Sequence, residues 1–355
     1  MGKKRLLVIG GLPDDVRKCQ YGGATVLMRN FKQFLETEGV PFVFVQTNRY
    51  SDRNGKSCRL LNAVDLCLNF VRSIFLCDRV MFNFSDNSTV RNYPFLSSVA
   101  SMLGRIVILR KFGGSFDTYL EGVGRCRKRR CIRALNRAAI IYAETGHSVS
   151  HIRSLVGNPE KVHRFPNVRR PASRLKNSPE MNHRLAFMSH ILDEKGVGDL
   201  IAAAAKLPDG YTVDLYGAIK EDKYRGYDFK AVGVNYKGEI TSETVMSLLP
   251  EYQFLLLPSY REGYPGIIIE AMSVGTPVIA TTVGGIPEMI TDGYNGLLVV
   301  PGDVAGLCDR IVSVTAAEYG KLCLNALKTF NGFYNSDTVN PVILNEMMNV
   351  RAERK

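Results

Sequence analysis

The residues best suited to chemistry lie in one stretch, Ser259-Tyr-Arg-Glu-Gly-Tyr-Pro-Gly-Ile-Ile-Ile-Glu-Ala-Met-Ser-Val-Gly-Thr-Pro277. Two carboxylates, Glu262 and Glu270, follow the apolar run Phe254 to Leu257. Glycine and proline between them disfavour a helix, so we expect a helix to begin near Ile267 with Glu270 in its opening turn. The free amides and positive dipole end of such a helix favour a diphosphate. A carboxylate beside it can accept two hydrogen bonds from a ribose diol.

The same stretch resembles the signature of family 4 glycosyltransferases, in which two glutamates are separated by seven residues, as Glu262 and Glu270 are. The similarity continues without a gap through Thr281 to Glu288 and Asp292 to Asp303. Members of that family have the two-domain fold called GT-B and transfer a sugar from a nucleotide diphosphate donor with retention of anomeric configuration. The resemblance therefore implies a retaining glycosyltransferase built from two Rossmann-like, doubly wound parallel-sheet domains that face a cleft.

The resemblance also implies which residues meet the donor. Glu270 would bind the ribose hydroxyls, Glu262 and the following loop amides would meet the sugar and phosphates, and Tyr236 lies in a segment that resembles the one receiving the base. The pair Gly22 and Gly23 resembles the family's glycine loop, although a turn between a strand and a helix needs glycine in any case. The predicted donor-binding residues are Glu270, Gly263, Tyr264, Pro265, Gly266, Ile267, Tyr236, Gly22 and Gly23.

A further segment, Phe187 to Gly196, resembles the family's Gly-Arg-x4-Lys-Gly stretch, and Lys195 would neutralise the donor diphosphate. Ser189 and His190 stand where glycine and arginine are usual, so a permanent positive charge is replaced by a group that can be neutral at pH 7. We expect tuned phosphate binding or weakened activity, unless His190 is a strand-end histidine with a local hydrogen bond. The predicted catalytic residues are Glu262, Lys195 and His190.

Candidates on the acceptor side lie at the end of the apolar run 106–112 and shortly after it. Relatives often carry a catalytic-site histidine at this strand end, and none is present here. Arg110, Lys111 and Asp117 are the remaining candidates, with ordinary surface charges as the alternative.

We expect the negative charge of the leaving nucleotide to be stabilised by protein groups and not by a metal. No Asp-x-Asp triplet occurs in the sequence, which argues against a metal-bound diphosphate and predicts that no metal or other cofactor is required. Lys195, His190 and the helix start would stabilise the leaving nucleotide. We expect departure from the front face of the sugar, with a phosphate oxygen taking the acceptor proton, in a cleft closed against water. A nucleotide-sugar epimerase or hydrolase on the same scaffold is the alternative, and neither would need an acceptor.

Strands that alternate with helices must position these residues. Apolar runs separated by helix-length segments occur at 5–10, 41–46, 80–85, 106–112 and 138–143, and again at 184–190, 211–217, 232–236, 254–258 and 277–281. Such alternation implies parallel sheets, and a chain of 355 residues suggests about two domains. We predict an acceptor-side domain over 1–168, a Pro- and Arg-rich linker over 169–182, a donor domain over 183–332, and a C-terminal helix over 333–355 that crosses back to the first domain.

The positive charge is concentrated in the first half of the chain. Residues 1–170 carry 29 Lys/Arg and 12 Asp/Glu, whereas residues 171–355 carry 17 and 22. The segment 124–139 holds seven cations and no acid, several of them at helical spacing. We interpret it as a basic amphipathic helix that contacts an anionic membrane carrying a glycan or lipid-linked acceptor, with a solvated helix face as the alternative.

Other classes of protein fit less well. The acidic second half and the lack of an interleaved aromatic and basic platform oppose nucleic-acid binding. A nicotinamide enzyme is also disfavoured, because no Gly-x-Gly-x-x-Gly follows the first predicted strand. The eight scattered cysteines and the absence of a hydrophobic leader or a long apolar run predict a cytoplasmic protein. We expect it to be peripheral on the inner face of the cytoplasmic membrane, in polysaccharide biosynthesis.

Overall fold

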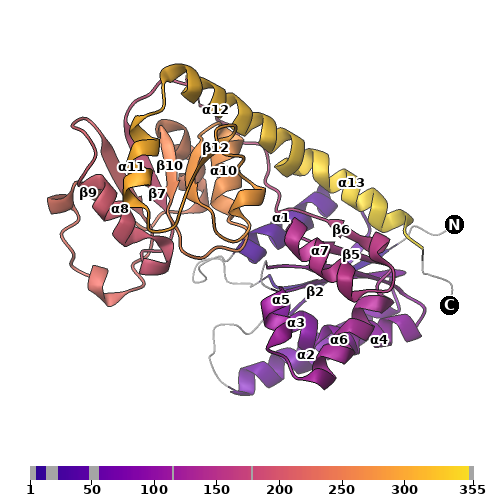
Figure 1. The fold of residues 1–355 in the computed structure, drawn as a ribbon. Helices are drawn as coiled ribbons and strands as arrows, with labels where there is room; N and C mark the ends of the chain where they lie inside the picture. The colour runs from indigo at the N-terminus through magenta and orange to yellow at the C-terminus, as the bar shows by residue number, and fades with distance from the viewer. Residues whose placement is uncertain (1–4, 13–22, 48–55, 114–115, 177–178, 352–355) are drawn as a thin grey trace. The chain divides into compact units, whose positions relative to one another are not determined.

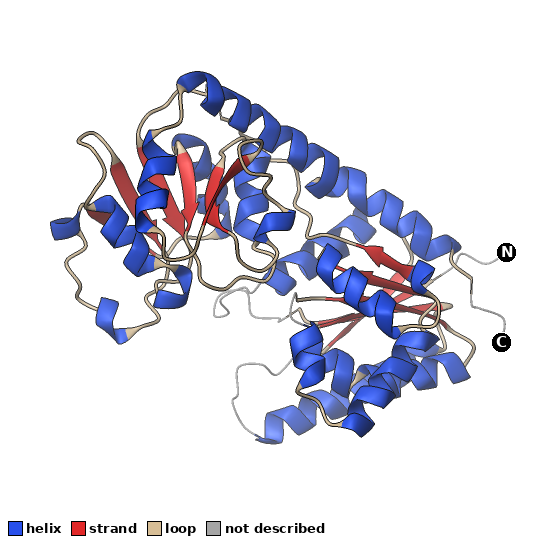
Figure 2. Ribbon diagram, in the orientation of Figure 1, coloured by secondary structure: helices blue, strands red, loops and turns tan. Residues whose placement is uncertain are grey.

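The computed structural model describes residues 5–12, 23–47, 56–113, 116–176 and 179–351. The chain divides into two compact units, residues 1–167 with 339–355, and residues 168–338. Each unit contains one sheet of six parallel strands with helices packed on it (Figures 1 and 2). The predicted alternation of strands and helices is confirmed, because every predicted apolar run overlaps an observed strand.

The sheet of the first unit has the strand order β2-β1-β3-β4-β5-β6. Its strands are β1 (Leu6–Gly10), β2 (Phe42–Gln46), β3 (Arg79–Phe84), β4 (Ile106–Lys111), β5 (Ile140–Ala143) and β6 (Val162–Arg164). Its helices are α1 (Gly23–Thr37), α2 (Lys56–Ile74), α3 (Asp86–Arg91), α4 (Tyr93–Met102), α5 (Phe116–Glu121), α6 (Arg125–Arg137) and α7 (Gly146–Leu155). One apolar core joins the inner sides of α2, α4, α6 and α7 to alternate strand residues such as Val80 and Phe82. Side chains alternate between the faces of a strand, so this core lies on one face of the sheet.

The sheet of the second unit has the strand order β12-β11-β10-β7-β8-β9. Its strands are β7 (Arg184–Met188), β8 (Thr212–Tyr216), β9 (Val234–Gly238), β10 (Phe254–Leu257), β11 (Val278–Thr281) and β12 (Gly296–Val299). Its helices are α8 (Val197–Ala204), α9 (Ser242–Leu248), α10 (Gly266–Val274), α11 (Val304–Val312) and α12 (Ala316–Thr329), followed by α13 (Ser336–Asn349), which runs on into the first unit.

Two apolar cores cover the two faces of the second sheet. Leu185 and Phe187 belong to one core, and the alternate residues Ala186 and Met188 belong to the other. A sheet buried on both faces is typical of a doubly wound fold. Strand order supports this, because β7 pairs with β8 on one side and with β10 on the other.

The described residues of the predicted linker 169–182 belong to the second unit. Lys176 donates its backbone N–H to Val274 O at 2.9 Å, and its ammonium group donates to the carbonyls of Pro250 and Tyr252. The Pro- and Arg-rich composition suggested an exposed connection, whereas these polar groups are satisfied by packing on the donor unit. The change of unit falls between Asn167 and Val168.

The C-terminal part of α13, from Val339 onward, belongs to the first unit. Tyr142 Oη on β5 donates to Glu346 Oε2 at 3.0 Å, and Arg79 Nη1 donates to Val350 O at 2.8 Å. The chain therefore returns to the unit in which it began. Across the described ranges, no helix is both long and apolar enough to cross a membrane.

Candidate functional site

The two residues Lys195 and Glu262 meet at the carboxyl ends of neighbouring strands of the second unit. Lys195 follows β7, Glu262 follows β10, and these strands pair in parallel. Lys195 Nζ lies 2.8 Å from Glu262 Oε1, and Ser259 Oγ donates to the same oxygen at 2.8 Å. The structure thus brings together two side chains that are far apart in sequence, at the strand end where open parallel sheets bind ligands.

Helix α10 supplies an anion-binding geometry beside this pair. It begins at Gly266, one residue before the predicted start, and the residue before it, Pro265, makes no side-chain cap. Ile268 N donates to Pro265 O at 3.3 Å, so the amides of Gly266 and Ile267 are the ones available to a ligand, and the dipole places positive charge there. Glu270 lies on the following turn, where its carboxylate accepts a hydrogen bond from Arg169 Nε at 2.8 Å.

Arg169 is the residue that sequence reasoning missed. It was assigned to a linker, although a basic residue shortly before a predicted donor domain is a signal that could have been weighed. Its side chain is only 9% exposed and reaches Glu270 across about a hundred residues of sequence. Backbone pairing fixes its position, because Arg169 N donates to Tyr334 O and Ser336 N donates to Arg169 O, both at 2.9 Å.

Three glycines hold the loops of the site by close backbone contact. A Cβ atom placed on Gly196 would lie 1.9 Å from Pro258 O, one on Gly217 would lie 1.8 Å from Ser189 O, and one on Gly284 would lie 1.9 Å from Glu262 O. All three have positive φ, which any other residue adopts only with strain. Glycine therefore permits the close backbone contact that fixes the position of each loop.

His190 stands exposed near Lys195. The protein around its ring removes part of its hydration, and Lys220 and Lys195 repel a further positive charge, so its pKa lies below the usual 6.5. At pH 7 the imidazole is therefore neutral, and it does not replace the permanent charge of an arginine.

The remaining donor-side candidates lie at different depths. Tyr236 is partly exposed on β9, and its hydroxyl donates to Gly217 O at 3.1 Å. Tyr264 is buried, with its hydroxyl 2.8 Å from that of Tyr334. Only its backbone, and not its side chain, is therefore placed to contact a donor. Gly23 is the first residue of α1, whereas Gly22 lies outside the described residues.

The acceptor-side candidates belong to the first unit. Arg110 and Lys111 are buried at the end of β4, so the alternative of ordinary surface charge is wrong for both. Arg110 stacks on the Phe165 ring at 3.5 Å, and burial lowers its pKa to about 9. Lys111 Nζ pairs with Asp86 at 2.7 Å.

Asp117 lies apart from those two cations, in the first turn of α5. Its carboxylate lies 2.8 Å from His147 Nε2 in the first turn of α7, and this hydrogen bond holds the pKa of Asp117 below its usual value. Because β4 and β5 are neighbours, both residues stand at the carboxyl edge of the first sheet.

Residues 182–316 match the model of a family described as Glycosyl transferases group 1. An uncharacterized glycosyltransferase of Methanocaldococcus jannaschii is 30% identical over 146 residues, which cover 41% of this chain and 41% of that protein. The match therefore spans about two fifths of the length of this relative.

Solved structures match over nearly the whole chain. HepE of Anabaena in complex with UDP covers 97% of this chain and 99% of its own, with a TM-score of 0.72 and 18% identity. The lipopolysaccharide outer core galactosyltransferase WaaB, in its apo form, has the same coverage, a TM-score of 0.70 and 17% identity. At such identity the likeness shows the fold, and the predicted GT-B fold class is confirmed.

Substitution of Gly284 tests whether close backbone contact positions Glu262. Gly284→Ala should cost about 1 kcal/mol for its positive φ and about 1 to 3 kcal/mol more for displacing the Glu262 carbonyl. Gly293→Ala is the matched control, since Gly293 has φ +71° and no atom within 4 Å of an added Cβ. Chemical denaturation measures both losses, and equal losses would contradict the positioning role.

The histidine titration can be measured directly. We expect the His190 ring to titrate below pH 6.5 in an NMR pH series, with His190→Gln identifying its signal. Because the folded protein then binds this proton less readily than the unfolded chain, acidification through that range lowers the free energy of unfolding. A His190 midpoint above 6.5 would contradict the environment described here.

Proposed function

We propose that this chain, whose residues 182–316 form a domain of the group 1 glycosyl transferases, moves a sugar from a nucleotide diphosphate sugar to an acceptor hydroxyl. One observation carries the proposal: two carboxylates, each paired with a cation at 2.8 Å, stand beside the uncapped start of α10. A nucleotide sugar presents the complementary groups, namely a ribose diol, a diphosphate and sugar hydroxyls.

Each residue has a defined role in this proposal. Glu270 accepts hydrogen bonds from the ribose hydroxyls, and Glu262 meets the sugar while Lys195 and the α10 amides face the diphosphate. These positive groups stabilise the leaving nucleotide, so we assign no metal or other cofactor to the reaction. The bond from the anomeric carbon to the diphosphate breaks, the acceptor oxygen bonds to the same face, and the acceptor proton passes to the departing phosphate oxygen. This order of events retains the anomeric configuration.

The first unit carries a surface suited to an anionic membrane, which would bring a lipid-linked glycan acceptor to the enzyme. Helix α2 buries Leu66, Phe70 and Ile74 in the core. A second apolar stripe, on the opposite side of α2 and continuing to Phe75 just after its end, is exposed, with Leu68 53% and Phe75 62% accessible. The stripe consists of Leu61, Val64, Leu68, Val71 and Phe75. An amphipathic helix normally has a polar outer side, so this one is prepared for an apolar neighbour.

Positive charge in the same unit favours lipid as the neighbour of the stripe. Helix α6 packs on α4, and the seven cations between Arg125 and Arg137 are exposed except for the half-buried Lys128. Each cation contributes about 1 kcal/mol near an anionic bilayer. An apolar stripe with a basic helix in the same unit matches the chemistry of interfacial binding.

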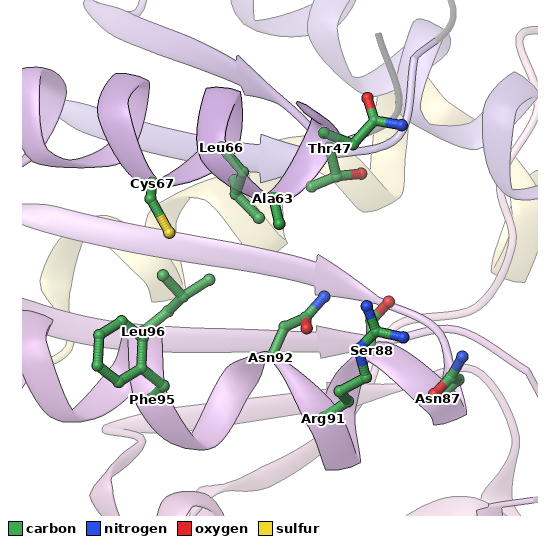
Figure 3. A pocket seen from close by; sticks show the side chains of 11 residues that line it. Thr47, Ala63, Leu66, Cys67, Asn87, Ser88, Arg91, Asn92, Phe95 and Leu96 are labelled. Carbon is green, nitrogen blue, oxygen red and sulfur yellow. The ribbon is translucent and has the colours of Figure 1, made fainter. Parts of the chain in front are cut away.

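A cavity of about 390 Å³ lies between α2 and the α3–α4 segment, beside the stripe (Figure 3). Its lining is divided, with Phe95, Leu96 and Cys67 toward one end and Arg91, Ser88 and Asn87 toward the other. The polar end lies toward the carboxyl ends of the strands, where β3 is followed directly by α3. We assign this cavity to the amphiphilic acceptor.

Binding of nucleotides tests the donor site. In calorimetry without metal, we expect the wild type to bind one of uridine, guanosine or adenosine diphosphate, and Glu270→Ala to lose at least about tenfold in affinity because the ribose contacts are removed. Uridine diphosphate is the first probe, because HepE is seen with UDP. The absence of binding to all three would overturn the proposal, whereas nucleotide release from the sugar donor without any acceptor would favour a hydrolase or epimerase.

Flotation with vesicles tests the membrane surface. The wild type should bind vesicles containing phosphatidylglycerol at low salt, and binding should weaken as salt screens the charges. Gln substitution of Leu61, Leu68 and Phe75 should abolish binding, while Gln substitution of Arg129, Arg133 and Arg137 should lower the partition coefficient about a hundredfold.

Matched variants in the second unit control for lost apolar area and lost charge. Gln at the exposed positions Val300, Val312 and Leu324 removes comparable apolar side chains, and Gln at Lys206, Lys230 and Lys321 removes the same charge. Both should leave vesicle binding unchanged. The stripe would instead bind a second copy of the chain if the wild-type protein does not bind vesicles but forms a dimer. Gln substitution of Leu61, Leu68 and Phe75 would then disrupt this dimer.

A further inference from the structure

The side chain of Arg169 is held on one side and open on the other. Its Nη1 donates to Val168 O at 3.1 Å, and its Nε donates to Glu270 Oε1 at 2.8 Å. In the described part of the chain, Nη2 has no hydrogen-bond acceptor. Most of the Arg169 side chain is buried, but Nη2 is not among the buried polar atoms that lack a partner, so its N–H groups face solvent and are accessible to a ligand.

The open side of the guanidinium lies at the start of α10. A Cβ atom placed on Gly266, the first residue of that helix, would come within 2.0 Å of Arg169 Nη2. A cation and the positive end of a helix repel one another at such a distance. The arrangement becomes favourable when an anion accepts hydrogen bonds from both, in the way that phosphate is bound at helix starts.

His190 does not add a permanent positive charge to this site. The segment around Lys195 has His190 where the resembling family has arginine, and the lowered pKa of His190 leaves it neutral at pH 7. Arg169 carries a permanent charge on a planar fork that matches two phosphate oxygens. Arg169 belongs to the segment before β7, whereas His190 belongs to the segment after it.

We propose that Arg169 binds the diphosphate of the donor at the start of α10, taking the place of the positive charge that His190 does not supply. This role rests on the proposed function and refines its donor site. The same guanidinium holds Glu270 through Nε, so the ribose carboxylate and the diphosphate cation are positioned by one side chain. A residue larger than Gly266 at the first helical position would displace Nη2 from this place.

The test compares a nucleoside with its diphosphate on the same variants. Calorimetry, with displacement for the weaker ligand, gives the affinity of uridine diphosphate and of uridine for the wild type, Arg169→Gln and Arg169→Lys. The quantity measured is the gain in affinity that the diphosphate adds to the nucleoside. We expect Arg169→Gln to reduce this gain about ten- to a hundredfold and Arg169→Lys, which keeps the charge without the fork, to restore part of it.

Arg170→Gln is the matched control, because Arg170 is the adjacent arginine and is exposed. It should leave the gain unchanged. If Arg169→Gln weakens uridine and uridine diphosphate by the same factor, Arg169 only positions Glu270 and the inference is wrong. If it tightens diphosphate binding, Arg169 blocks the site and the inference is equally wrong.

Failure of the proposed function would look different. A wild type that binds none of the three nucleoside diphosphates would remove the donor site itself, before any variant is compared. A wild type that binds one of them, together with an unchanged Arg169→Gln, would remove only the role of Arg169. Where guanosine or adenosine diphosphate is the one bound, that nucleotide and its nucleoside serve as the pair.

Discussion

The positive start of helix α10 is the feature on which the rest of the candidate site depends. The buried strand β10 fixes where the helix begins, and Pro265 before it provides no capping side chain. The amides of Gly266 and Ile267 therefore remain available to a ligand, which costs the free protein some stability but prepares an anion site. This one helix fixes the positions of Glu262, which precedes it, and of Glu270, which lies within it.

Paired charges around that helix prepare the site more than they stabilise the fold. Lys195 with Glu262 and Arg169 with Glu270 are largely removed from water, and the desolvation of such pairs offsets much of their attraction. Their benefit lies in geometry, because each carboxylate is already oriented before a ligand arrives. The glycine contacts act in the same way, since the close backbone contacts of Gly284 and Gly196 fix the positions of the loops that carry these residues.

The first unit uses its surface differently. Its buried cations Arg110 and Lys111 belong to the interior of the strand ends, whereas the exposed cations lie on α6, in the same unit as the unusual apolar side of α2. A helix with apolar residues on two opposite sides satisfies the core with one and leaves the other for an external partner. The positive charge of the first half of the chain is therefore divided between buried cations such as Arg110 and Lys111 and exposed cations such as those of α6.

The sequence by itself determined the elements and the family likeness. Apolar runs of the right length predicted the parallel sheets, and Gly263 to Gly266 predicted the start of α10 to within one residue, because these signals are local. Only the tertiary structure decided which distant residues meet. Arg169 was hidden in an apparent linker, and the sequence left open whether Arg110 and Lys111 were acceptor-side residues or surface charges, since pairing and burial depend on contacts between segments that local patterns do not encode.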